Sequence, residues 1–218
     1  MKGLLIKDIK LMLGQKRFFV VVLGMGLMLM VTGEQPSSAM GYIVMLLTIF
    51  SLSTLSYDEH ENGMNFLLTL PVSRKTYVQE KYVFAAGLAL TSSVFAGALA
   101  SVVTVAKGLT LYITEFLAVG GVMIVLSLLI ISFMMPVEIK FGAEKGRLAM
   151  FAVFAVLGVI VGISVKLLEN MGVDTERELM KLSISSPQVI VAALVGITVL
   201  AFVTSYFVSV KIINKKEY

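Results

Sequence analysis

The sequence contains no cysteine, no tryptophan and only one histidine, His60. Without cysteine the chain has neither disulfides nor thiolate metal ligands. The patterns H-E-x-x-H and G-x-x-x-x-G-K-S/T are also absent, which excludes the zinc site and the ATP-binding P-loop that they encode. We therefore expect a chain that is not an enzyme and has no catalytic residue, no metal site and no cofactor of its own.

Charged residues are scarce as well. They make up 15% of the chain, whereas a soluble domain has roughly a quarter, and the mean hydropathy is +0.94. A transmembrane helix needs about 20 apolar residues, and six uncharged runs approach or exceed that length. We predict an all-α integral membrane protein with a single transmembrane domain over 1–218. Its six spans are expected near 16–32, 39–57, 82–106, 116–137, 148–165 and 188–210.

The ends of three spans carry local signals. The first uncharged run, 18–31, is short, so its helix is expected to begin earlier with Lys16 and Arg17 at headgroup level. A cleaved signal peptide is disfavoured because 17 patterned residues precede this run. Pro136 is expected to close the fourth span, and Pro187 to begin the sixth in the usual first-turn position.

The basic residues are distributed unevenly between the predicted loops. Of the 18 Lys and Arg residues, 14 lie in 1–17, 58–81, 138–147 and 211–218. Because cytoplasmic loops are enriched in Lys and Arg, this bias predicts that both termini are cytoplasmic. We expect a multi-pass protein of the plasma (inner) membrane, whose basic residues contact membrane lipid and not nucleic acid.

The six uncharged runs contain no Asp, Glu, Lys, Arg or His by definition. Ion-coupled carriers normally keep such groups inside the bilayer, so this composition disfavours proton coupling. Hydroxyl groups occur in the second and third runs, where they either line a path or bond to their own helix backbone, as we favour. In the fifth run, small residues share one helix face and pack either within the chain or in a dimer interface. They are Ala155, Gly158 and Gly162.

The N-terminal segment 1–17 is predicted to form an amphipathic helix along the membrane. Five apolar residues fall within one arc at 100° per residue, while Leu4 and Leu11 lie outside it. The polar face, which includes Asp8, either rests on anionic lipid or also contacts a cytoplasmic partner. The candidate contact residues are Leu5, Asp8 and Ile9.

The most informative segment is 57–81, which is charged and lies between two long apolar runs. Within it, 62–70 has a narrow polar stripe and an otherwise apolar surround, so a helix there must be buried on two sides. Either it contacts a soluble partner or it touches only lipid and neighbouring spans. Its acidic start is expected to be a solvated patch, with cation binding as the alternative. Pro71 ends the helix and Ser73 caps the next one, while Arg74, Tyr77, Val78 and Lys81 form a stripe expected at headgroup level.

Four sequence patterns resemble a known family: LLIKDIKLML (4–13), YDE (57–59), FLLTLPVSRK (66–75) and TYVxxK (76–81). Together they resemble the small six-helix permeases of the ABC-2 class, and most of all bacterial exporters of amphipathic peptide toxins of the phenol-soluble-modulin type. This resemblance implies a coupling helix over 63–70, between spans 2 and 3, that docks into a groove on a separate ATPase subunit. The implied ATPase-coupling residues are Asp58, Glu59, Gly63, Phe66, Leu67, Leu70, Pro71, Arg74 and Lys75.

The resemblance also implies partners. We expect two copies of an ABC ATPase subunit, which hold the ATP and Mg²⁺, and a second permease subunit in a homodimer or heterodimer. The function expected is ATP-driven export of hydrophobic or amphipathic cargo, with peptides favoured. The alternative is an ATP-independent secondary transporter or channel.

Overall fold

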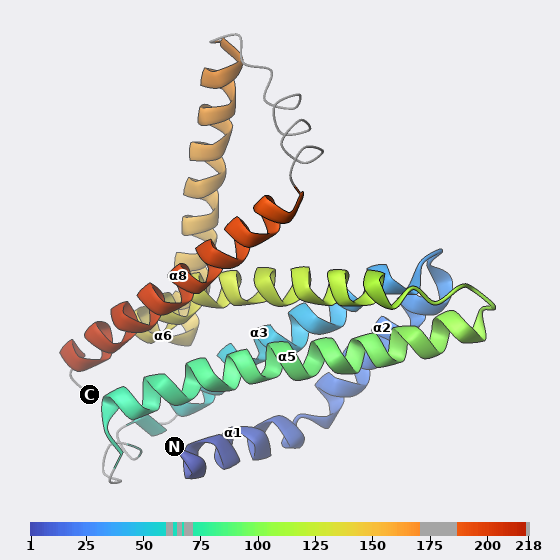
Figure 1. Cartoon of the computed structure of the whole chain (residues 1–218). Coiled ribbons are helices and arrows are strands. Elements are labelled where there is room, and N and C mark those ends of the chain that lie inside the picture. The colour runs from blue at the N-terminus through green and yellow to red at the C-terminus, as the bar shows by residue number, and fades with distance from the viewer. Residues whose placement is uncertain (60–62, 65–66, 68–71, 171–186, 217–218) are drawn as a thin grey trace.

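The computed structural model describes the chain except for residues 60–62, 65–66, 68–71, 171–186 and 217–218. The described residues form helices and no strand, which confirms the all-α class. In chain order the elements are α1 (Lys2–Gly14), α2 (Lys16–Thr32), the 3₁₀ helix η1 (Pro36–Ala39), α3 (Met40–Glu59), α5 (Arg74–Ala106), α6 (Ile113–Asn170) and α8 (Pro187–Lys215), as Figure 1 shows.

Four helical stretches among the described residues are long and apolar enough to cross a membrane. α2 coincides with the first expected span and forms with α1 a pair bent by 67°. The fifth expected span, 148–165, lies in the helix after Gly142, where most side chains fall outside the description. The total of six spans therefore stays a prediction. The four stretches are Pro36–Asp58, Arg74–Ala106, Ile113–Gly142 and Val191–Lys215.

The helices form a bundle in which α3 packs against both α5 and α6, and α6 packs against α8. α1 lies beside α3 and α5 at the end of the bundle where α3 ends, α5 begins and α8 ends (Figure 1). The part of α6 after Gly142 rises away from the bundle, and α8 returns to it (Figure 1). Two buried apolar clusters fill the interior, one around Leu55, Tyr77 and Met135 and the other around Met30, Met40 and Ala96.

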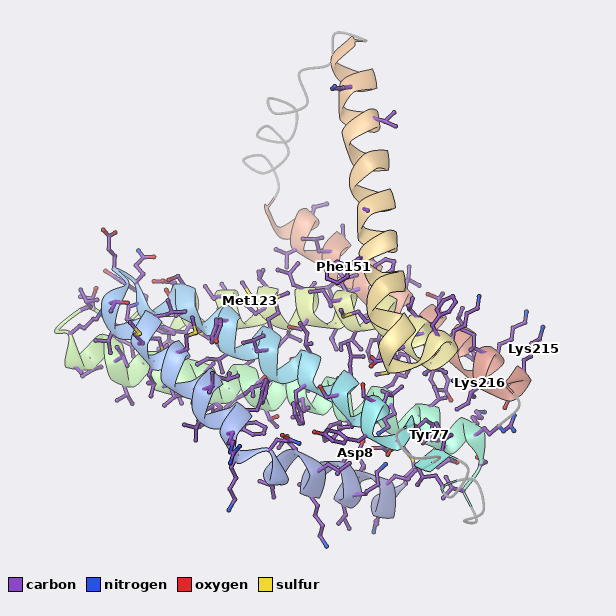
Figure 2. All side chains as sticks on the ribbon, turned by 180° about the vertical axis from the view of Figure 1, so that it is seen from behind. Asp8, Tyr77, Met123, Phe151, Lys215 and Lys216 are labelled. Atoms are coloured by element: carbon purple, nitrogen blue, oxygen red, sulfur yellow. The ribbon has the colours of Figure 1, made fainter. Side chains whose placement is uncertain are left out.

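Glycine lets α3 approach its neighbours closely. A Cβ added at Gly41 would lie 2.8 Å from the Sδ of Met123 on α6 (Figure 2). A Cβ added at Gly26 on α2 would lie 2.6 Å from a side-chain carbon of Ile43. Small residues at such contacts are the usual means by which membrane helices pack without a hydrophobic driving force between them.

The outward surface of the described spans is apolar. Val94, Leu117 and Phe207 are exposed to 76%, 71% and 64%. Exposed apolar side chains along whole helices are costly in water but are what the hydrocarbon of a bilayer requires. The burial pattern therefore agrees with a membrane-embedded bundle.

Two predicted helix starts are confirmed, and one predicted helix end is wrong. The Ser73 side chain caps α5 by accepting a hydrogen bond from the Thr76 backbone N–H at 3.1 Å, and α8 begins at Pro187. Pro136, however, does not end the fourth span, because α6 continues through it. A proline inside a membrane helix is tolerated where neighbouring groups satisfy the freed backbone atoms. The break comes at Gly142 instead, with φ 78° and ψ 172°.

This backbone conformation is accessible to glycine and almost closed to other residues. We expect Gly142→Ala to lower the free energy of unfolding by roughly 1–3 kcal/mol. Thermal unfolding of the purified protein in detergent measures the effect. The matched control is Gly87→Ala in α5, where no atom lies within 4 Å of an added Cβ. This control should leave the melting temperature unchanged or raise it, and equal losses in both variants would contradict the argument.

Candidate functional site

Three helices meet at a group of buried charged side chains. Two of these helices, α3 and α5, flank the segment 60–71 in the sequence. Asp8 comes from α1, Asp58 from the end of α3 and Lys81 from the second turn of α5. The ammonium nitrogen of Lys81 lies 2.5 Å from Asp8 Oδ2 and 2.8 Å from Asp58 Oδ2. It also donates to Thr54 Oγ1 at 2.9 Å. All three ammonium protons of Lys81 therefore have acceptors.

Lys7 and Tyr77 complete this arrangement at its edge. Lys7 is partly exposed, donates to Asp58 and lies 3.2 Å from Asp8 Oδ1. The Tyr77 hydroxyl donates to Asp58 Oδ2 at 3.1 Å, and Figure 2 shows Tyr77 and Asp8 at the same end of the bundle. We call Lys7, Asp8, Asp58 and Lys81 the ionic cluster. Its two ammonium groups balance its two carboxylates.

Burial makes the ionic cluster energetically important. Asp8, Lys81 and Asp58 are exposed to only 0%, 1% and 5%. Removing one partner from a buried ion pair leaves an uncompensated charge and typically costs 3–5 kcal/mol. The ionic cluster therefore holds α1 against α3 and α5, and it links the two helices that flank 60–71.

A further carboxylate lies next to the ionic cluster without joining it. Glu80 precedes Lys81 in α5 and is completely buried. Neither of its side-chain oxygens has a hydrogen-bond partner among the described residues. A buried carboxylate without a hydrogen-bond partner is costly, so the placement of Glu80 opposes folding when the group is ionised.

Arg74 ties the beginning of α5 to the end of α8. Its guanidinium donates to the backbone carbonyls of Ile213, Asn214 and Lys216 at 3.1, 3.2 and 3.1 Å. The last carbonyls of a helix have no partner within the helix and carry its negative dipole end. Arg74 satisfies them, so α8 is fastened to the same end of the bundle as α1, α3 and α5.

The predicted coupling residues fall into three groups. Asp58 belongs to the ionic cluster, Arg74 caps α8, and Leu67 packs against the buried cluster around Tyr77. Gly63 is partly buried, and Lys75 is exposed at the start of α5. The side chain of Glu59 and the positions of Phe66, Leu70 and Pro71 lie outside the described residues. The helix over 63–70 is described only at Gly63, Met64 and Leu67, each of them helical, and the coupling helix stays a prediction.

The N-terminal helix turns a different face to the bundle than its amphipathic pattern indicates. Asp8 was placed on the polar outer face, but its carboxylate is buried against Lys81, so that placement is wrong. Leu4, one turn earlier, is buried with it. Leu5 and Ile9 lie on a groove of about 400 Å³ between α1 and α5, and Ile9 remains 43% exposed. Contact of Leu5 and Ile9 with an ATPase stays a prediction.

The stripe expected at headgroup level is also misplaced. Tyr77, Val78 and Lys81 are each at most 2% exposed, because α1 and the end of α3 cover this part of α5. Residues Lys7 and Glu80 were not singled out by sequence reasoning. The signal that could have found the site is the stripe of Leu4, Asp8 and Leu11, at positions i, i+4 and i+7, which lies outside the apolar arc on a face of its own.

The small face of the fifth expected span is open where it is described. Ala155 and Gly158 are exposed, and no atom lies within 4 Å of a Cβ built on Gly158. The surroundings of Gly162 lie outside the description. Figure 2 shows the helix that carries Phe151 standing apart from the bundle. A dimer contact through this face stays a prediction.

Removal of the Lys81 charge tests whether the ionic cluster holds the fold together. Lys81→Met keeps the length of the side chain but leaves Asp8 and Asp58 with Lys7 alone, and we expect a loss of roughly 3–5 kcal/mol of stability. The control, Lys107→Met, removes an exposed lysine at the other end of α5. Thermal unfolding in detergent compares the two, and similar melting temperatures would show that the cluster contributes little.

Glu80 should behave in the opposite way. Glu80→Gln removes a buried charge that has no hydrogen-bond partner among the described residues and keeps the shape of the side chain, so we expect stability to be unchanged or increased. Asp8→Asn, which also replaces a buried carboxylate by its amide, should reduce stability because it unbalances Lys81. Melting temperatures of the two variants give the comparison, and destabilisation by Glu80→Gln to the same extent would refute the distinction.

Comparison with known proteins identifies the family. A family model described as ABC-2 family transporter protein matches residues 3–214, which is nearly the whole chain. No curated protein and no solved structure matches the chain. Proteins of this family are membrane permeases of ABC transporters and associate with an ABC ATPase subunit, in agreement with the apolar helices and the charged end described above. The chain belongs to the ABC-2 family of transporter proteins.

Proposed function

We propose that this permease is the membrane subunit of an ATP-driven exporter that moves hydrophobic or amphipathic cargo, with amphipathic peptides as the favoured class. The observation that carries the proposal is the ionic cluster. It joins α1, the end of α3 and the start of α5 on both sides of the segment 60–71, which is the proposed docking segment for the ATPase.

The contacts at this end support a mechanical role. A force applied to 60–71 acts on Asp58 at one side and on Arg74 and Lys81 at the other. The force would be transmitted to α1 through the salt bridge between Lys81 and Asp8. It would be transmitted to the end of α8 through the hydrogen bonds of Arg74. Four helices would then move together when two ATPase subunits close around ATP and Mg²⁺.

The interior supports an apolar cargo. The hydroxyl groups of Thr48, Thr104 and Thr198 each donate to the backbone carbonyl four residues earlier. Their protons are therefore already used within the helix and do not bind a polar ligand. Between α5 and α6 lies a cavity of about 410 Å³ with a mostly apolar lining. A path between this chain and a second permease, identical or different, would present few polar groups that reject an amphipathic peptide. The resemblance to exporters of peptide toxins points to the same cargo.

One observation favours the alternative, an ATP-independent secondary transporter. Ionisable groups buried in membrane helices are the usual coupling sites of ion-driven carriers, and Glu80 is such a group, within the apolar stretch Arg74–Ala106. Against this, the neighbouring charges of Lys81, Asp8 and Asp58 are paired with one another. We therefore keep ATP-driven export as the main proposal.

The test uses the exposed lysines at the two ends of α5. The chain is purified from its native membranes in mild detergent together with its ATPase subunit, and inside-out vesicles are assayed for ATP-dependent uptake of a fluorescent amphipathic helical peptide. Lys75→Glu reverses a charge at the proposed docking end and should reduce both ATPase association and uptake by at least about tenfold. Lys107→Glu makes the same change at the far end and should leave both unchanged.

Two outcomes would contradict the proposal. Uptake that persists without ATP and collapses when the proton gradient is dissipated would support the secondary transporter. Equal association of the ATPase with the Lys75→Glu and Lys107→Glu variants would mean that it docks elsewhere. Vanadate-sensitive uptake that is lost only in the Lys75→Glu variant is the result we expect.

A further inference from the structure

Partly and fully exposed residues of α6 and α8 line a basic cavity, open to the surface, that the transport proposal does not use. Its volume is about 630 Å³. Four of the six residues that line it are lysines, and the other two are aliphatic. The lining is formed by Lys140 from α6 and by Val208, Lys211, Ile212, Lys215 and Lys216 from α8. We refer to it as the lysine cavity.

The lysine cavity has a large excess of positive charge. No acidic side chain belongs to its described lining. Lys216 donates to the backbone carbonyl of Ile139 at 3.1 Å, and the ammonium of Lys140 lies 4.9 Å from the ring centroid of Phe141. For Lys211 and Lys215, within the part of the chain that the structure describes, there is no salt bridge. The ammonium groups of Lys140, Lys211 and Lys215, for which no salt bridge is found among the described residues, repel each other, and a bound anion would relieve this repulsion.

The position of the lysine cavity along α8 indicates what kind of anion fits. Val208, Lys211, Ile212 and Lys215 are spaced i, i+3, i+4 and i+7, so they share one face of the helix. Along that face Val208 is followed by Lys211 and, after Ile212, by Lys215, which is the last residue of the apolar stretch Val191–Lys215. Phe207 and Val208, just above, are 64% and 49% exposed. A molecule on this face would meet hydrocarbon-facing side chains first and ammonium groups one turn later.

We propose that the lysine cavity binds the headgroup of an anionic phospholipid, in the leaflet on the side of the C-terminus, with an acyl chain along Val208. A phosphodiester supplies the missing negative charge, and the aliphatic side chains supply a surface for the chain. A free inorganic anion would use only the ammonium groups. A zwitterionic lipid would bring a positive charge of its own next to Lys140, Lys211 and Lys215.

The bound headgroup would act on the junction between α6 and α8. Lys140 belongs to α6 just before the break at Gly142, while the other lysines belong to the last turns of α8. Arg74 caps the same turns from α5. Figure 2 shows Lys215 and Lys216 at the end of α8, on the side of the bundle where Tyr77 lies. An anion shared by these lysines would hold α6 and α8 together and stabilise the folded chain.

The experiment measures lipid binding to the full chain, purified and delipidated in a neutral detergent. The probes are dioctanoyl phosphatidylglycerol, dioctanoyl phosphatidylcholine and inorganic phosphate. Native mass spectrometry counts retained lipid, and thermal unfolding reports stabilisation. The test variant is Lys211→Gln with Lys215→Gln. The matched control is Lys2→Gln with Lys10→Gln, which removes two exposed lysines from α1 and lowers the net charge equally.

We expect the wild-type chain to retain phosphatidylglycerol in preference to the other two probes. The test variant should bind it about tenfold more weakly, and the control variant should match the wild type. Lys140→Gln, on the other wall of the cavity, should weaken binding independently of any change in α8. Equal weakening in test and control would show a general attraction of charge and overturn the proposal. Equal binding of phosphatidylcholine, or of inorganic phosphate, would overturn it in favour of an acyl groove or a simple anion site.

Discussion

The interaction on which this end of the molecule depends is the set of three hydrogen bonds from one ammonium group, that of Lys81. Asp8, Asp58 and Thr54 each accept one of them, and each acceptor arrives from a different position in the chain. Burying a lysine without such partners would cost several kcal/mol, so α1 and α3 have to stay in place for α5 to keep this side chain inside. The ionic cluster is therefore a constraint on geometry more than a source of stability. None of the three helices can shift alone without leaving a charge uncompensated.

This constraint divides the molecule into a tied end and a more loosely joined remainder. At the tied end, Lys81 links α1, α3 and α5, and Arg74 links α5 to α8. At the opposite end the described helices meet in steric contacts, as at Gly41 against Met123, and in two hydrogen bonds, from Ser37 to Glu115 and from Lys107 to the Gly33 carbonyl. The described salt bridges all lie at the tied end, and contacts without a buried ion pair permit sliding more readily than a saturated ammonium does. Beyond Gly142, α6 leaves the bundle altogether (Figure 1). Motion that starts at the tied end would therefore be shared by four helices and absorbed where the packing consists of apolar contacts or ends at a glycine.

Much of the fold could be predicted from the sequence, because span positions follow from local hydrophobicity. The cap at Ser73 and the start of α8 at Pro187 were also predicted correctly, because both depend only on residues within one helical turn. The errors share a different cause. Pro136 continues the helix, and Asp8 and Lys81 are buried, because in each case residues far away in the sequence supply the missing partners. A pattern at 100° per residue finds two faces of a helix but does not say which of them meets lipid and which meets another helix.

Glu80 shows how the charges and the transport path are kept apart. All the ionised groups discussed for the ionic cluster lie between residues 7 and 81, at one end of the spans, whereas the described stretch of α5 beyond them is uncharged as far as Ala106. A permease that moves apolar cargo, as proposed above, would need uncharged spans. A permease driven by a soluble ATPase would need its charged contacts at the end of the spans where the ATPase docks. Glu80 lies at the boundary of the two regions, beside balanced charges to which it makes no hydrogen bond. Burying this carboxylate without a hydrogen-bond partner costs free energy, so Glu80 offsets part of the stability that the balanced charges of the ionic cluster give to this end of the bundle.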